Sequence, residues 1–136
     1  MADLGRLKGL VKEFEEKYRG SGLEPFIFVD EYRLGCEQPW PVITTTHKGV
    51  YGIFSNKDLL YIGKVTGKTR VICHRMNDYF TILSDFSYDG AKDNWSQEPT
   101  HFVAWGVPDE SFFEASALEE FLIERLKNEL PDNTRK

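Results

Sequence analysis

The sequence predicts an α+β fold in which helices flank a small, three-stranded antiparallel sheet, with an extra helix and a short strand at the N-terminus. Apolar residues recur at helical spacing near both ends of the chain and once in its middle. Short runs of β-branched and aromatic residues lie between these segments, as strands require. With 136 residues, the chain is long enough for one domain of this kind and too short for two.

The N-terminal part, 1–48, is expected to be an extension of a core that spans 49–133 within a single domain, 1–136. A helix is predicted from Asp3 to about Tyr18, and Gly20-Ser21-Gly22 ends it. Its apolar face consists of Leu4, Leu7, Leu10, Val11 and Phe14. A short strand is predicted at 26–29, followed by a loop rich in structure-breaking residues that ends at Pro41.

A β-hairpin is predicted next. The segments 42–46 and 49–54 are rich in β-branched and aromatic residues, and so is 59–65. The intervening Ser55-Asn56-Lys57-Asp58 has the composition of a turn.

The rest of the chain is predicted to contain a helix, a loop, a strand and a long C-terminal helix. A helix over 69–83 follows from the stripe of Ile72, Met76, Phe80 and Leu83. The segment 84–99 is polar and without periodicity, which indicates a loop. A strand is expected at 101–107. Ser111 and Glu114 have the spacing of a capping box for the last helix, which stops at Pro131.

The composition restricts the partners and the compartment. Seventeen basic and 22 acidic residues give a net charge of −5, which argues against a general nucleic-acid coat protein or a polybasic membrane binder. The two cysteines, Cys36 and Cys73, lie far apart and form no disulfide or metal motif. No apolar run approaches the roughly 20 residues of a membrane span. We therefore expect a soluble, cytoplasmic protein with reduced thiols.

The charge is unevenly distributed along the chain. The segment 47–80 holds six basic and two acidic residues, a balance of +4, so the remainder carries −9. The positive segment coincides with the predicted hairpin and the helix after it. Weak, salt-sensitive nucleic-acid binding through one small face is therefore expected.

An ordered set of residues lies along the predicted hairpin and helices: Gly49-Val50-Tyr51, Tyr61-Ile62-Gly63-Lys64, Arg75, Glu119 and Asn133. Two tripeptides on one hairpin, followed by an arginine in one helix and a glutamate in another, resemble the GIY-YIG nuclease family. The resemblance covers 49–133. It implies a three-stranded sheet flanked by helices and metal-dependent endonuclease activity on DNA, with Mg²⁺ or Mn²⁺ as cofactor. DNA is preferred to RNA by this resemblance alone.

The resemblance also implies a role for each residue of the set. Tyr51 and Tyr61 would be the hairpin tyrosines, Gly63 the glycine of close approach, and Lys64 the phosphate-facing lysine. Arg75 would be the catalytic arginine, Glu119 the metal ligand and Asn133 the asparagine at a helix end. Lys68 and Arg70 would join Lys64 and Arg75 in binding the nucleic acid.

Phosphodiester hydrolysis gives these residue types a physical purpose. The reaction needs a nucleophilic water, a cation for the charge that develops on the phosphate, and a proton for the leaving oxygen. One carboxylate can hold Mg²⁺, because that ion keeps several waters and also binds the substrate phosphate. A tyrosine with the usual pKa of about 10 is a poor base. Tyr51 could accept the proton of the water only if Lys64, Arg75 or the metal stabilised its phenolate.

The helical pattern distinguishes Glu119 from its neighbour Glu120. Residues three and four positions from Glu119 are mostly apolar, so this acid borders the stripe that faces the sheet, whereas Glu120 belongs to the solvated face. A carboxylate next to a core needs a compensating partner, either a divalent cation or a salt bridge to Arg75.

Arg75 and the tyrosines also have structural alternatives. Arg75 could extend beside the core between Val71 and Tyr79. Arg70 lies nearer the family's usual distance from Gly63, but the residues after Arg75, Met76-Asn77-Asp78-Tyr79-Phe80, resemble the family's helix, in which some members carry His and others Tyr at the position of Tyr79. Arg75 is therefore preferred, and Arg70 is expected to be a phosphate contact or a solvated charge at the helix start. Tyr51 and Tyr61 could simply pack across the hairpin. They can share a face only if the hairpin has a bulge or an odd loop, because a plain four-residue loop at 55–58 would place them on opposite faces.

For the remaining candidates, structural roles compete with functional ones. Gly63 could mark a strand bulge, and Asn133 could be only a helix-end residue. His74 lies beside Arg75, but His47 and His101 are far away in sequence, which argues against a zinc site. Trp40, Trp95 and Trp105 are expected to anchor the core or loops rather than stack on bases.

Two other functions compete with the nuclease hypothesis. The chain could be a catalytically weak or inactive module of the same fold that binds nucleic acid or protein. It could also be an accessory domain whose first helix docks a partner through Leu4, Leu7, Val11 and Phe14. A partner protein or a homo-oligomer is expected to help target a nuclease of this size, and no membrane partner is expected.

Overall fold

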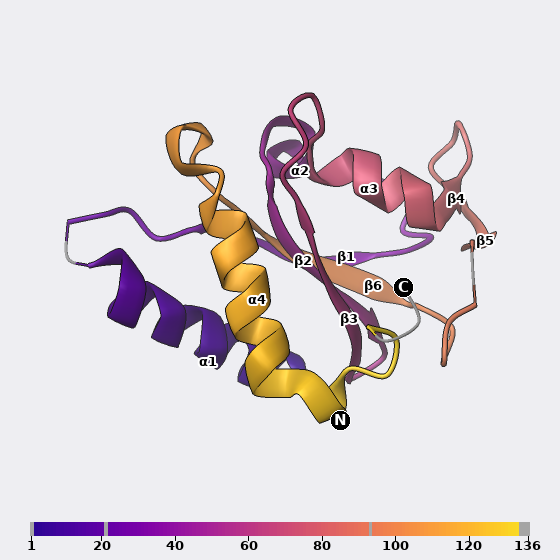
Figure 1. Ribbon diagram of the computed structural model, residues 1–136. Coiled ribbons are helices and arrows are strands. Elements are labelled where there is room, and N and C mark those ends of the chain that lie inside the picture. The colour runs from indigo at the N-terminus through magenta and orange to yellow at the C-terminus, as the bar shows by residue number, and fades with distance from the viewer. Residues whose placement is uncertain (1, 21, 93, 134–136) are drawn as a thin grey trace.

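Four antiparallel strands form the main sheet in the order β1-β6-β2-β3 (Figure 1). They are β1 (Ile27–Arg33), β2 (Gly49–Ser55), β3 (Asp58–Val65) and β6 (His101–Gly106). The computed structural model describes residues 2–20, 22–92 and 94–133. With three main helices and a separate two-stranded hairpin, the fold is α+β, as the sequence predicts.

The main sheet has four strands rather than the predicted three, because β1 pairs with β6. The strand is also longer than the predicted segment 26–29. Its register shifts between Val29 and Tyr32, and both of these side chains are buried. This bulge breaks the apolar alternation at Asp30 and Glu31, so the second half of the strand is not visible in the sequence pattern.

The hairpin of β2 and β3 agrees with the predicted strands 49–54 and 59–65, but Ser55 and Asp58 pair as well, so the turn consists of Asn56 and Lys57 rather than of the predicted four residues. The segment 42–46, predicted as a strand, is instead the short helix α2 (Val42–Thr46). The hydroxyls of Thr44 and Thr45 donate to the carbonyl oxygens of Pro41 and Val42 at 2.6 Å. These local hydrogen bonds satisfy a helical turn and override the strand preference of β-branched residues.

The central helix is shorter than predicted. Helix α3 (Ile72–Tyr79) ends where Phe80 adopts an extended conformation, and the chain continues into β4 (Phe80–Ile82). This strand pairs with β5 (Tyr88–Ala91), which lies in the segment predicted as a loop. Phe80 is buried from a strand rather than from the helical stripe. Its helical spacing from Ile72 and Met76 therefore wrongly extended the predicted helix beyond Tyr79.

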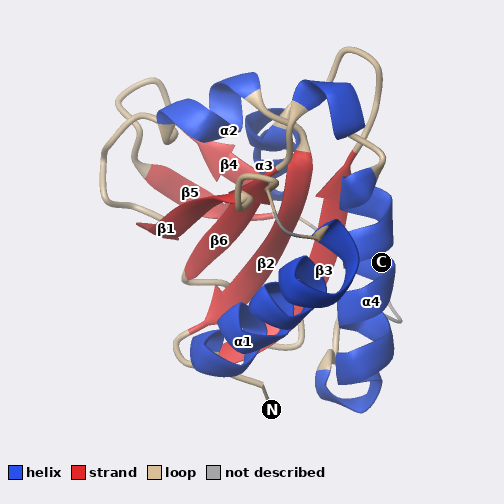
Figure 2. Cartoon of the chain, turned by 90° about the vertical axis from the view of Figure 1, so that its left-hand side faces the viewer, coloured by secondary structure: helices blue, strands red, loops and turns tan. Residues whose placement is uncertain are grey.

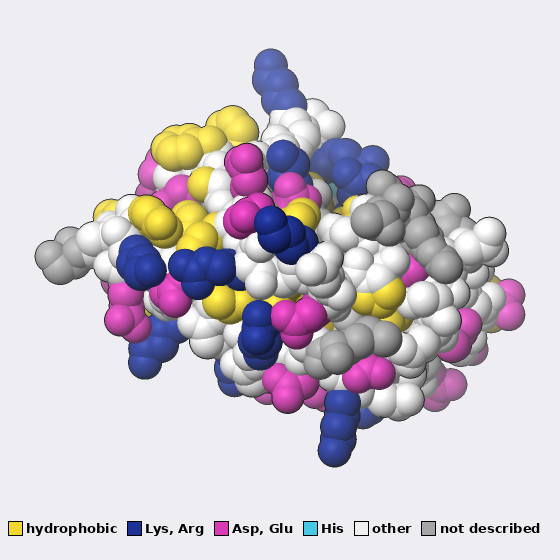
Figure 3. Space-filling model, turned by 60° about the horizontal axis from the view of Figure 1, so that its bottom comes forward, with side chains coloured by type: hydrophobic (Ala, Val, Ile, Leu, Met, Phe, Trp, Pro, Cys, Tyr) yellow, Lys and Arg dark blue, Asp and Glu magenta, His cyan; other side chains and the backbone are white. Residues whose placement is uncertain are grey.

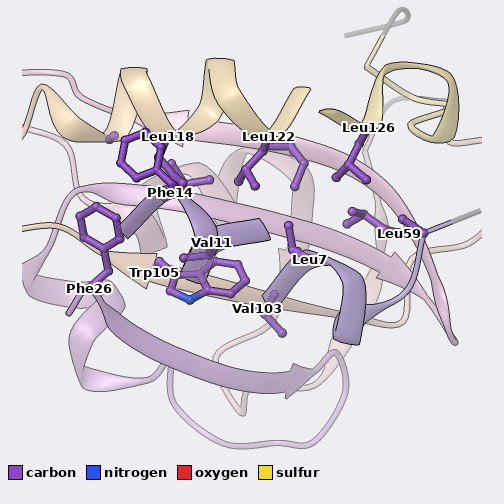
Figure 4. Close-up of a cluster of buried hydrophobic side chains, with 14 of the residues drawn as sticks. Leu7, Val11, Phe14, Phe26, Leu59, Val103, Trp105, Leu118, Leu122 and Leu126 are labelled. Carbon is purple, nitrogen blue, oxygen red and sulfur yellow. The ribbon is translucent and has the colours of Figure 1, made fainter. Parts of the chain in front are cut away.

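Helices α1 (Leu4–Phe14) and α4 (Glu114–Leu126) pack on one face of the main sheet (Figure 2). A turn of π-helix, η1 (Glu15–Arg19), continues α1. Leu7, Val11 and Phe14 are buried against side chains of α4 and the sheet (Figure 4). The predicted apolar face of the first helix thus belongs to the core, which removes the basis for docking a partner through it.

The other face of the main sheet carries α3 and the β4–β5 hairpin. Ile72 and Met76 of α3 pack there with Tyr51, Ile53 and Phe102 of the sheet. The N-terminal residues 2–48 contribute α1, β1 and α2 to these two layers, so their core contacts are shared with the rest of the chain.

The capping box predicted for the last helix is not formed. Ser111 lies in a 3₁₀ turn, η2 (Asp109–Ser111), and its hydroxyl donates to the Glu114 carboxylate at 2.9 Å instead of accepting a backbone N–H. Helix α4 begins only at Glu114 and is followed by another 3₁₀ turn, η3 (Lys127–Glu129), before Pro131. In the described part of the chain, no helix combines the length and apolar character that crossing a membrane requires.

Candidate active site

A β-bulge at Leu60 brings the two hairpin tyrosines to the same face of the sheet. Ile53 pairs with Tyr61 and Phe54 with Leu59, so Leu60 is the extra residue of β3. Tyr51 and Tyr61 then both face α3, with ring centroids 6.3 Å apart. The sequence predicts that Tyr51 and Tyr61 share a face only if the hairpin has a bulge or an odd loop, and the register confirms a bulge.

A third tyrosine joins this pair from α3. The Tyr79 hydroxyl oxygen lies 2.7 Å from that of Tyr51, and the Tyr79 and Tyr61 ring centroids are 6.0 Å apart. Tyr51 is 1% exposed and Tyr79 8% exposed. Tyr79 is absent from the predicted set of site residues. The signal that could have found it is its position one helical turn after Arg75, on the same side of the helix.

Gly63 provides the space that Tyr51 occupies. It lies opposite Tyr51 in the hairpin register. A Cβ atom at Gly63 would lie 2.3 Å from the Tyr51 hydroxyl oxygen and 2.5 Å from the carbon that carries it. This geometry supports the close-approach role for Gly63, since any larger residue would displace the tyrosine.

Arg75 is the arginine whose charge reaches the two hairpin tyrosines and Glu119. Its positive charge lowers the pKa of Tyr51, Tyr61 and Glu119, although other effects outweigh it in each case. Arg70, the alternative, is instead paired with Asp78 at 2.5 Å. Asp78 also lies 3.6 Å from Arg75. The Nε atoms of both arginines are buried without a hydrogen-bond partner among the described residues.

Glu119 pairs with Lys64 rather than with Arg75. Its carboxylate lies 3.8 Å from the Lys64 ammonium, which also donates to the Ser116 hydroxyl at 3.1 Å. The Glu119 side chain is 21% exposed. Burial raises its pKa, and Lys64 opposes that shift. Glu120 is exposed, so the predicted difference between the two acids is confirmed.

The site extends around the outer edge of β3. Lys64 lies opposite Val50, on the face that α4 covers, whereas Tyr61 faces α3. Because β3 is the edge strand, side chains from its two faces can meet there. Burial and Tyr79 raise the pKa of Tyr61 most, and the negative charge of Glu119 adds to this shift from across the edge.

The tyrosines are held in their neutral form. Burial is the main cause that raises the pKa of Tyr51 far above its ordinary value, and Tyr79 adds to the effect. Burial, then Tyr79, also raises the pKa of Tyr61. Tyr51 could act as a base only if neighbouring cations stabilised its phenolate, and Arg75 alone does not achieve this. These phenols are equipped to donate hydrogen bonds.

Asn133 supports the edge of β3 through its amide group. Its side-chain oxygen accepts from the Ile62 N–H and its nitrogen donates to the Ile62 carbonyl, both at 2.9 Å. The neighbouring Asp132 is fully buried, donates its N–H to the Leu60 carbonyl, and accepts two hydrogen bonds from Ser96. Asn133 thus lies beside the bulge that orients Tyr61, after the last 3₁₀ turn rather than at a helix end.

The histidine and tryptophans have structural contacts. His74 accepts the Val71 N–H at 3.1 Å. Trp95 packs edge-on against Tyr61 and Tyr79, with ring centroids 6.0 and 5.6 Å apart. Trp40 packs on Tyr32, and Trp105 is buried in the core of the α1 and α4 layer. These contacts agree with the expected anchoring roles.

The donor set suits a metal with few protein ligands. Among the described residues there is no group of three or more His, Cys, Asp or Glu side chains that could hold a metal ion. A Mg²⁺ or Mn²⁺ ion that keeps most of its waters needs only one carboxylate. Glu119 fits this requirement, because it is partly exposed and its charge is only partly compensated by Lys64.

Of the predicted residues, Tyr61, Lys64 and Glu119 lie around the outer edge of β3, and Tyr51 lies on the neighbouring strand β2. Arg75 on α3 is near enough for its charge to lower the pKa of both tyrosines and of Glu119. Gly63 makes room for Tyr51, and Asn133 fixes the strand. Lys68 is exposed in the loop before α3, near Arg70. Comparisons of this chain with protein-family models, curated proteins and solved structures found no match.

Proposed function

We propose that this protein is a divalent-metal-dependent endonuclease that hydrolyses DNA phosphodiester bonds in the manner of the GIY-YIG family. The observation that carries the proposal is the bulge at Leu60. It turns Tyr61 toward Tyr51 and Tyr79, in reach of the charges of both Arg75 and Glu119. A hairpin that served only packing would not need a bulge that gathers phenols, a cation and a carboxylate at one edge.

The chain's own residues would divide the work as follows. Glu119 would hold Mg²⁺ or Mn²⁺, which supplies Lewis acidity and an activated water when bound. The planar guanidinium of Arg75 suits two phosphate oxygens, and Lys64 adds a point charge at the same edge. Both would stabilise the negative charge that develops on the phosphate.

The phenols would act as hydrogen-bond donors and as a relay. Because Tyr51 is neutral and bonded to Tyr79, it holds a proton at a fixed position instead of removing one from water in the resting protein. Tyr61 is more exposed than Tyr51, so its hydroxyl is the one best placed to reach the attacking water or a phosphate oxygen. This division changes the expected role of Tyr51 from base to positioning group.

Plasmid cleavage tests the proposal. The purified protein, incubated with supercoiled plasmid and Mg²⁺ or Mn²⁺, is expected to nick or cut it, and EDTA is expected to stop the reaction. Glu119→Gln and Arg75→Ala should each lower the rate by at least about a hundredfold, in the range seen for loss of a charge-stabilising group. Arg70→Ala should affect binding more than turnover.

Two exposed residues outside the site provide matched controls for these substitutions. Glu110→Gln and Arg33→Ala change the same residue types and should leave the rate within about twofold. Cleavage that persists unchanged in Glu119→Gln and Arg75→Ala would exclude this mechanism.

A second candidate is a module of the same fold that binds nucleic acid without cutting it. The observation that favours it is the internal pairing of charge: Lys64 compensates Glu119, and Asp78 compensates both arginines. Oligonucleotide binding that Arg75→Ala weakens, without cleavage in any divalent metal, would identify this module. The same oligonucleotides made as RNA and DNA would show which nucleic acid is preferred.

A further inference from the structure

We infer that a groove between η1 and α4 is a docking surface for a cationic amphipathic helix of a partner protein. The groove has a volume of about 550 Å³. Its floor and walls are aromatic: Phe14, Tyr18, Phe113 and Phe121. It lies on the α1 and α4 side of the main sheet, whereas the tyrosine cluster faces α3, so the inference does not depend on the proposed nuclease activity.

The aromatic rings of this groove are unusually open to solvent. Tyr18 and Phe113 are each 64% exposed, and Phe112, which directly precedes Phe113, is 44% exposed. Tyr18 contacts Phe14 and Phe121 with ring centroids 5.4 and 5.9 Å apart, so the exposed rings are continuous with buried ones. Hydrophobic side chains gather on the left of the space-filling view, with both acidic and basic side chains around them (Figure 3). Contiguous exposed apolar surface of this kind marks interaction sites.

The rim of the groove is acidic. Its charged lining residues are Glu114, Glu120 and Glu124, and no Lys or Arg is among the described residues that line it. Glu114 is compensated by Arg19 at 2.9 Å, and Glu124 by Lys127 at 3.2 Å. Glu120 has no ion-pair partner among the described residues, and its charge raises the pKa of Glu119. The surface therefore presents one carboxylate without an ion-pair partner among the described residues, Glu120, beside apolar rings.

These two properties define the occupant. A helix with large apolar residues on one face can place them against Tyr18 and Phe113, in the gap that two existing helices leave for a third. Lysine or arginine residues beside that face would meet Glu120 and the outer carboxylates. The rings also accept cations: the Arg125 guanidinium lies 4.6 Å from the Phe121 ring centroid. A nucleic acid does not fit, because its phosphates would face the acidic rim.

A designed peptide pair tests this surface. The cationic probe is a fluorescein-labelled helix of about 18 residues, roughly five turns, built from leucine on one face and lysine on the other. Its counterpart has every lysine replaced by glutamate. Fluorescence anisotropy with the full chain should show saturable binding of the cationic probe and at least tenfold weaker binding of the acidic one. In amide NMR spectra, the shifts should cluster at Tyr18, Phe113, Ala117 and Glu120.

Variants locate the binding and control for surface charge. Phe113→Ser and Glu120→Lys should each weaken binding of the cationic probe by about tenfold, the size of effect seen for an anchor residue. Leu83→Ser removes another exposed apolar side chain, and Asp89→Lys reverses another exposed acid. Both should change the affinity by less than about twofold.

Three results would overturn the inference. Equal affinity for both peptides would show that charge does not select the occupant. Binding that Phe113→Ser leaves unchanged would place the contact elsewhere. A concentration-dependent dimer in sedimentation that Phe113→Ser abolishes would assign the groove to a second copy of the chain instead.

Discussion

The hydroxyl oxygens of Tyr51 and Tyr79 lie 2.7 Å apart, in a position that buries both rings. Tyr51 comes from the sheet and Tyr79 from the last turn of α3, so this hydrogen bond joins two layers of the fold at the candidate active site. Each hydroxyl satisfies the other where little water can replace it. The bond therefore matters both for stability and for the position of the tyrosine cluster.

Tyr79→Phe should lower the free energy of unfolding by about 1–3 kcal/mol, because the buried Tyr51 hydroxyl loses its partner. Urea denaturation followed by far-UV circular dichroism measures this change. The double variant Tyr51→Phe/Tyr79→Phe should lose less stability than the sum of the two single losses, since it removes the Tyr51 hydroxyl that Tyr79→Phe leaves unpaired. The Tyr61 hydroxyl, which also bonds to Tyr79, loses that partner in both variants. A double variant whose loss equals the sum of the two single losses would contradict the assigned hydrogen bond.

Gly63→Ala should destabilise the protein by about 1–3 kcal/mol, because the added methyl group would overlap the Tyr51 ring. Urea denaturation measures the stability, and the amide NMR shifts of β2 report the displacement of Tyr51. Gly9→Ala is the matched control. Gly9 lies in α1 with no atom within 4 Å of an added Cβ. The Gly9→Ala substitution should stabilise the protein by about 0.5–1 kcal/mol, because alanine has a higher helix propensity than glycine. Equal effects at both glycines would refute the close contact.

Glu119 should make the folded state less stable as the pH rises above 4.5, the ordinary pKa of a glutamate. Burial raises its pKa in the folded chain, so the folded state binds this proton more tightly than the unfolded state. Stability from protonated Glu119 is then lost as the pH rises from 4.5 through the folded-state pKa. Glu119→Gln should remove this loss and should be at least as stable as the natural chain at pH 7.

Urea denaturation at several pH values between 4 and 8 checks this prediction. The difference in unfolding free energy between Glu119→Gln and the natural chain should grow in favour of the variant across the lower part of that range. Glu110→Gln, at an exposed position, should show no such trend. If Glu119→Gln instead became progressively less stable than the natural chain as the pH rises, the attraction of Lys64 would outweigh the effect of burial on the pKa of Glu119.

Asn133→Ala should expose the backbone groups of Ile62 and cost about 1–3 kcal/mol, because two hydrogen bonds at 2.9 Å are lost. Hydrogen exchange of the Ile62 amide should accelerate more than that of amides in the central strand β6. Asn133→Asp should have an intermediate effect, since a carboxylate can accept from the Ile62 N–H but cannot donate to its carbonyl. Unchanged exchange at Ile62 in Asn133→Ala would disprove the edge-supporting role.

The sequence predicted the hairpin and the helix-to-sheet packing because these follow from apolar periodicity. Leu7, Val11 and Phe14 in α1 and Leu118 and Leu122 in α4 are buried as their spacing requires. The helical state of 42–46 was not predictable in this way, because threonine hydroxyls decide it through hydrogen bonds to local carbonyls. The turn from α3 into β4 was missed because Phe80 continues a helical spacing while its backbone is extended.

The sequence indicated several residues of the candidate site, but it did not indicate Tyr79 or the position of the bulge. Order along the chain indicated Tyr51, Tyr61, Arg75 and Glu119. The bulge that lets the tyrosines meet falls on Leu60, a residue with no local preference for one. It is accompanied by distant hydrogen bonds from Asp132 and Asn133, which no pattern near the hairpin could reveal.

Three residues around that bulge are held by segments from opposite ends of the described chain. The Leu59 N–H donates to the carbonyl of Ala2, while Leu60 and Ile62 bond to Asp132 and Asn133. Contacts between residues so far apart in sequence carry the largest loop-closure entropy and form late in folding. Both terminal segments must therefore be in place before their hydrogen bonds can stabilise the bulge that orients Tyr61. Assembly of the tyrosine cluster is then a marker of complete folding, because its geometry requires both remote segments to be in place.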